Sequence, residues 1–189
     1  MILGSCPLNF LIPDIISYLV PFIVQMKKLV FTLLAVVIFQ FGFSQNIPPV
    51  EGVRLEAPQD YRNADSAVVQ VSKYFLKIPI DQDNNTRLTA GVFLVRWIAG
   101  TPEFDFDLNS NVFKYIKKDV DLLTVYYSCV ASFAIHHPAV NDANTITLNA
   151  AKLLVAYINN PANHVVLTRQ LKNLVEADAK GDLKSFLKL

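Results

Sequence analysis

Four polar side chains recur every fourth residue along an otherwise apolar segment: Thr124, Ser128, Ser132 and His136. In a helix this spacing puts each side chain about one turn from the next, on one slowly drifting face. Tyr127 lies beside this polar stripe. Hydroxyl groups beside aromatic rings can line a ligand pocket, and a serine one turn before a histidine can form a nucleophile and base. These five residues are the candidate ligand site.

A second interpretation of the same stripe is packing. Small hydroxyl residues let neighbouring helices approach closely, with each O–H group bonded to the carbonyl four residues earlier. Catalysis also needs an acid that orients the histidine, or a strained turn such as Gly-x-Ser-x-Gly, and neither stands at a defined spacing. We favour packing over a pocket, predict no catalytic residue, and lean against an enzyme.

Acidic residues at alternate positions raise the question of a cation site. Asp81, Asp83 and Asn85 have the first ligand spacings of a calcium loop, but Thr86 replaces its glycine and Val92 its bidentate glutamate. We interpret this run as a polar turn before a helix.

Neither a second acidic run nor the histidines make a stronger case for a metal. Glu103, Asp105 and Asp107 alternate as acids on a solvated face do. Cys129 precedes His136 by two turns, but the paired spacing of a zinc site is missing. We therefore predict no metal and no cofactor.

The stripe lies in a segment, residues 121–137, that has no formal charge between Leu122 and Ile135. Such a helix is expected to run through the middle of a bundle. Apolar periodicity and stop signals predict further helices on both sides of it. These cover residues 65–76, with Asp65 as N-cap, and residues 86–99, 111–118, 142–159 and 164–179, with a last turn at 183–187.

Two of these helices have a predicted buried face. Residues 86–99 present a broad apolar face, which we assign to the core: Leu88, Val92, Phe93, Val95 and Trp97. In residues 164–179, the predicted buried face is an apolar stripe that begins with Val166 and Leu167 and continues with Leu171.

Residues 103–108 change period, because Phe104, Phe106 and Leu108 alternate with acids as in a half-buried strand. Residues 53–56 also alternate and are a candidate partner strand. Without that pairing, the segment is an extended linker with its aromatic rings in the core. The fold class is therefore all-α: a single-domain bundle of five to seven helices with a short extended or two-stranded segment.

The N-terminal residues read as a targeting sequence. Met26-Lys27-Lys28 and the uncharged run of residues 29–43 resemble a secretory signal, and small residues at 42 and 44 predict cleavage before Gln45. We assign residues 1–25 to an over-extended start, 26–44 to the signal, 45–62 to an extended lead-in and 63–189 to the helical domain. The alternative is a membrane hairpin of residues 8–24 and 29–43, although prolines and a carboxylate make its first span poor.

Composition limits the partners. The chain has 189 residues, is 52% hydrophobic and has a mean hydropathy of +0.33. Its 17 Lys and Arg nearly balance its 16 Asp and Glu, so no field attracts nucleic acid. Cleavage removes Cys6 and leaves one cysteine, Cys129, so no internal disulfide is expected. It also removes the apolar run of residues 29–43, so no stable membrane anchor is expected.

Several segments together resemble exported helical proteins of Bacteroidota with no known activity. The resemblance rests on the Met-Lys-Lys signal ending before Gln45, residues 96–104, residues 157–161 and residues 181–183. It implies a periplasmic destination and transfers no reaction.

We therefore expect a periplasmic or secreted helical protein with a non-catalytic binding role, whose partner is an envelope protein or a small ligand. An envelope hydrolase with dispersed catalytic residues and a structural or stress-related envelope protein are the alternatives.

Overall fold

The computed structural model describes residues 50–82, 84–107 and 110–189. The chain divides into two units, residues 1–45 and 46–189, and every described residue belongs to the second. The predicted start, signal sequence and cleavage site lie outside the described residues, as do Cys6, Asp83 and Leu108.

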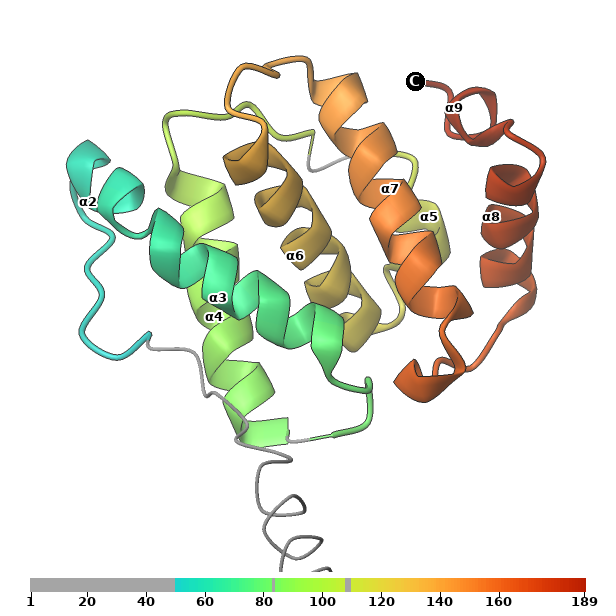
Figure 1. Ribbon diagram of the computed structural model, residues 1–189, viewed down its shortest axis with the longest axis horizontal. Coiled ribbons are helices and arrows are strands. Elements are labelled where there is room, and N and C mark those ends of the chain that lie inside the picture. The colour runs from blue at the N-terminus through green and yellow to red at the C-terminus, as the bar shows by residue number, and fades with distance from the viewer. Residues whose placement is uncertain (1–49, 83, 108–109) are drawn as a thin grey trace, which may run out of the picture. The chain divides into compact units, whose positions relative to one another are not determined.

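The described residues form an all-α domain, which confirms the predicted fold class: the structure is 67% helical with no strand in this part. Figure 1 shows the arrangement. The helices are α2 (Pro58–Asn63), α3 (Asp65–Lys77), α4 (Asn84–Gly100), α5 (Phe113–Ile116), α6 (Val120–His136), α7 (Ala143–Asn159), α8 (Arg169–Ala179) and α9 (Leu183–Phe186), with a 3-10 turn, η2 (Pro161–Asn163).

The most apolar helix, α6, lies in the middle of the domain with α3 and α4 on one side and α7 on the other (Figure 1). It faces two clusters of buried side chains. The larger cluster joins α6 to α5, α7, α8 and α9, and the second joins α3 and α4 to Ala131 of α6. Because α6 has no charged side chain between Leu122 and Ile135, it can border both clusters at once, and its predicted central position is correct.

Helix starts follow local capping. Asp119 accepts a hydrogen bond from the Leu122 amide at 2.9 Å, and Asp142 accepts one from Thr145 at 2.7 Å. Such caps satisfy amide groups that the first turn leaves unpaired. They start α6 and α7 within a residue of the predicted positions.

Helix α8 begins at Arg169, five residues later than predicted. Thr168 caps it by accepting from the Leu171 amide at 3.3 Å, and His164 has a left-handed φ of 54° that ends the preceding turn. Val166 and Leu167 therefore lie before the helix, 81% and 43% exposed, and the prediction that they belong to its buried stripe is wrong.

The predicted lead-in contains a helix, because α2 occupies residues 58–63. Pro58 stands at its first turn, where a missing N–H is tolerated, and the Asp60 carboxylate accepts from the Glu56 and Ala57 amides. No residue of α2 is buried, so it has no apolar period to detect. With α2, the described residues contain eight α-helices instead of five to seven. Asp65 follows the N-cap position, which Ala64 occupies.

Residues 53–56 and 103–107 form no paired strands in the described part of the chain. Residues 103–107 have no regular secondary structure. The rings of Phe104 and Phe106 stack at 5.7 Å between centroids, and each lies about 6 Å from the Trp97 ring. The period-two pattern therefore reflects packing onto α4, as the linker alternative predicted, and not hydrogen bonding between strands.

Candidate functional site

The first half of the polar stripe bonds back to its own helix. Thr124 Oγ1 donates to the Val120 carbonyl at 2.9 Å, and Ser128 Oγ donates to the Thr124 carbonyl at 3.0 Å. Ser128 is fully buried. A Cβ added at Gly91 of α4 would lie 3.2 Å from Thr124 Cγ2, so α4 and α6 approach closely here. This geometry fits the packing interpretation of the stripe.

The five candidate site residues do not share one cavity. Thr124 lines a groove between α4 and α6, whereas Ser132 and His136 line an open depression that also includes residues of α3 and α7. Tyr127 and Phe106 both line a separate small cavity. The stripe drifts around α6, so different turns face different neighbours.

The arrangement of Ser132 and His136 differs from that of a nucleophile and its base. The ring Nδ1 of His136 lies 2.6 Å from the backbone carbonyl oxygen of Ser132, so the ring is oriented by the backbone. His137 makes the same contact with the Phe133 carbonyl at 2.9 Å. Both rings thus bond to carbonyls at the end of α6, as expected of histidines at a helix C-terminus.

Two further reactive groups on α6 belong to the core. Burial raises the pKa of the Cys129 thiol and raises that of Tyr126 to about 12. The Tyr126 hydroxyl lies 3.3 Å from Ser110 Oγ. Both groups stay protonated at neutral pH, so neither is activated as a nucleophile.

One acid of each predicted acidic run lies beside a basic side chain. Asp81 Oδ1 lies 3.1 Å from His164 Nδ1, and Asn85 is already inside α4. Glu103 pairs with Arg62. Over residues 50–82, 84–107 and 110–189, no three His, Cys, Asp or Glu residues are grouped so that they could hold a metal ion.

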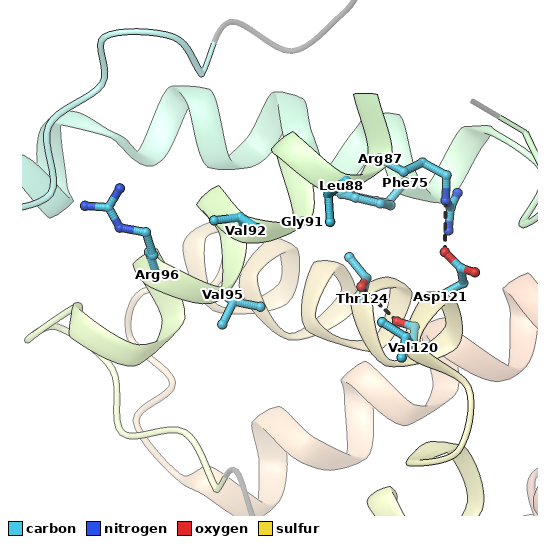
Figure 2. Close-up of a pocket in the computed structure, with 10 residues that line it drawn as sticks. All are labelled: Phe75, Arg87, Leu88, Gly91, Val92, Val95, Arg96, Val120, Asp121 and Thr124. Atoms are coloured by element: carbon cyan, nitrogen blue, oxygen red, sulfur yellow. Dashed lines mark hydrogen bonds and ion pairs between the residues drawn. The ribbon is translucent and has the colours of Figure 1, made fainter. Parts of the chain in front are cut away.

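The groove between α4 and the first turns of α6, here called the α4–α6 groove, has a volume of about 370 Å³. Four large apolar side chains line it and are open to solvent: Leu88, Val92 and Val95 of α4 are 69%, 53% and 44% exposed, and Val120 of α6 is 74% exposed. Figure 2 shows them between the two charged ends of the groove. Exposed apolar side chains gathered in a groove, as opposed to scattered singly, mark a binding surface.

The charged ends of the groove differ. Arg96 lies at one end, exposed, and Arg87 lies at the other beside Asp121 (Figure 2). Arg87 is only 4% exposed, and its Nε lies 3.4 Å from Asp121 Oδ1. The Asp121 side chain is 55% exposed. The surface therefore shows a guanidinium at one end and a carboxylate at the other.

Arg87 is held beneath the groove by several weak contacts. Its guanidinium lies 5.1 Å from the centre of the Phe75 ring, and Nη1 donates to the Pro79 carbonyl at 3.4 Å. Its Nη2 is buried without a hydrogen bond. The same guanidinium lies near the Tyr157 hydroxyl, where it opposes the rise in the pKa of Tyr157 caused by burial. Arg87 thus joins α4 to α3, α6 and α7.

The sequence prediction placed the groove residues in the core. The buried side chains of α4 are instead those of Ala90, Phe93, Leu94, Trp97 and Ile98, with Arg87, and Gly91 is buried beside them. Leu88, Val92 and Val95 lie on another face, so their assignment to the core is wrong, whereas that of Phe93 and Trp97 is correct. The sequence signal that was missed is the width of the apolar surface of α4. A helix at the edge of a bundle buries one face, so an apolar surface that extends over two faces indicates that one of them is exposed.

No helix within the described ranges is both long and apolar enough to cross a membrane. Comparison of the chain with protein-family models, with curated proteins and with solved structures found no match. The fold and the groove define an all-α domain with an exposed apolar surface.

Proposed function

We propose that this protein is an exported, non-catalytic interaction domain of the cell envelope, and that it docks a protein partner in the α4–α6 groove. The observation that carries the proposal is the group of four exposed apolar side chains in one groove. Exposing such residues to water is unfavourable, at about 25 cal/mol per Å² of apolar surface, and a docked partner removes that surface from water.

The shape of the groove supports a protein over a small ligand. Leu88, Val92 and Val95 are spaced four and three residues apart, which makes a ridge along α4 like the ridges that pack between helices. The side chains project outward and do not surround an enclosed space (Figure 2). A helix of another protein subunit matches this relief, because its own side chains fit between those of the ridge.

Export rests on residues 26–44, whose charged start, apolar run and small residues at 42 and 44 act together as a signal. The resemblance to exported helical proteins supports the same destination, the periplasm. Expression of the chain in a bacterial host is expected to yield an envelope protein that begins at Gln45, checked by N-terminal sequencing. A chain that retains Met1, or one held in the membrane by residues 29–43, contradicts export.

Docking in the groove predicts a site-specific cross-link. A photo-reactive amino acid at Val92 is expected to give a covalent protein adduct in cells, because the partner covers this side chain, and Leu88→Lys in the same chain is expected to abolish the adduct. Mass spectrometry of the adduct identifies the protein attached.

The matched control places the photo-reactive group at Val166, which is 81% exposed but lies outside the groove. Equal adducts from positions 92 and 166, or an adduct at 92 that persists in the Leu88→Lys chain, would show that the groove is not a docking surface.

A further inference from the structure

The α4–α6 groove has a direction. Arg96 is exposed at one end and takes part in no ion pair among residues 50–82, 84–107 and 110–189. At the other end, the half-exposed Asp121 carboxylate covers the buried Arg87. The exposed apolar side chains lie between these ends (Figure 2). A partner for this surface needs an apolar ridge with a charged group at each end. Its acidic group must face Arg96, and its basic group must face Asp121.

A second copy of the same surface meets this requirement by symmetry. A two-fold axis perpendicular to the groove reverses its direction, so that the cationic end of each copy faces the anionic end of the other. Along the sequence of α4, Val92 stands midway between Leu88, which is on the Asp121 side of the groove, and Arg96 (Figure 2). The axis that matches the charges therefore passes close to Val92.

We propose that the partner docked in the α4–α6 groove is a second copy of this chain. The two α4 helices lie antiparallel, with Leu88, Val92 and Val95 of each copy against the same ridge of the other. Arg96 of each copy faces Asp121 of the other. This inference rests on the proposed function, because it names the partner of the same groove.

The size of the apolar surface sets the strength of the association. Each copy contributes four apolar side chains and two charged side chains to the contact. A standard protein interface has roughly 20–30 residues from each partner, so this contact is smaller. The dimer is therefore weak and depends on concentration. The cross-wise charge pairs set its antiparallel register, because a parallel arrangement places Arg96 against Arg96.

The test begins with a disulfide at the expected axis. In the full chain carrying Val92→Cys, mild oxidation in cells is expected to give a covalent dimer on non-reducing gels, since two residues beside a two-fold axis meet their own copies. Val166→Cys is the matched control, because Val166 is more exposed than Val92 but lies outside the groove. Both chains keep the buried Cys129, and cleavage before Gln45 removes Cys6 from both, so background oxidation is the same. The dimer yield at position 92 is expected to exceed that at 166 at least about tenfold.

Charge reversal tests the register. In the Val92→Cys chain, Arg96→Glu is expected to lower the dimer yield severalfold, and so is Asp121→Lys, because each places like charges together twice in a homodimer. Co-expression of the two charge-reversed chains with different tags is expected to restore a mixed dimer, in which both charge pairs are again opposite. If Asp121→Lys fails to fold beside Arg87, the Arg96→Glu chain alone decides the register.

The outcomes separate this inference from the proposed function. A Val92 adduct that contains only a different protein overturns the dimer and leaves the docking surface in place. Equal disulfide yields at 92 and 166, or a yield at 92 that Arg96→Glu leaves unchanged, also overturn it. Absence of any adduct specific to position 92 overturns both.

Discussion

Trp97→Ala is expected to lower the free energy of unfolding by about 3–5 kcal/mol, the largest effect of any substitution considered for this domain. Trp97 is fully buried and is one of the largest side chains in the core between α3 and α4. Its indole N–H donates to the Tyr61 carbonyl at 3.1 Å, and its ring lies against Phe104 and Phe106. Alanine leaves a cavity and removes the ring against which Phe104 and Phe106 pack.

The measurement is urea unfolding of the purified domain followed by far-UV circular dichroism, because the chain has one tryptophan and the variant has none. Leu88→Ala on the same helix is the matched control and is expected to change stability by less than about 0.5 kcal/mol, since Leu88 is 69% exposed. Equal losses for the two variants would mean that the buried face of α4 is assigned incorrectly.

The second large effect is expected at the polar stripe, where Ser128→Leu should cost about 1–3 kcal/mol by overpacking. Ser128 is fully buried, and its hydroxyl bonds to the Thr124 carbonyl. Leucine puts three carbon atoms where serine has one oxygen, and the two extra heavy atoms have no space beside a fully buried side chain. Ser128→Ala removes only the back-bond, at about 0.5–1.5 kcal/mol.

Ser132→Leu is the control, one turn further along α6. Ser132 is only partly buried and borders the open depression that includes His136, so leucine can extend into solvent without displacing a neighbour. Its unfolding midpoint in urea is expected to stay close to that of the parent protein. A Ser128→Leu domain as stable as the Ser132→Leu domain contradicts the packing interpretation and makes a pocket the better explanation of the stripe.

Much of the fold is readable from local sequence. The caps at Asp119 and Asp142 start α6 and α7, and Pro138 and Pro161 follow their ends. These signals act within a few residues, since a cap bonds amides of the next turn and a proline blocks the helix where it stands. The central position of α6 also follows from composition, because the stretch from Leu122 to Ile135 has no charged side chain to direct a face toward water.

The site was less predictable, for a reason visible on α4. Its sequence offers two apolar faces, one with Phe93 and Trp97 and the other with Leu88 and Val92, and both satisfy helical periodicity. Only one can lie against α3 and the aromatic side chains of residues 103–107. The larger face, with its indole and phenyl rings, is buried, and the smaller one is left to line the groove.

The sequence by itself thus determined the helical class, the positions of most helices and the candidate polar stripe. The tertiary structure decided which apolar side chains are buried, that Phe104 and Phe106 pack on Trp97 and not in a strand, and that the stripe is divided among separate surfaces. The physical reason is range: capping and helical period depend on neighbours a few residues apart. Burial is a competition among all the apolar faces of the chain for a limited interior, and its outcome depends on contacts between residues distant in sequence.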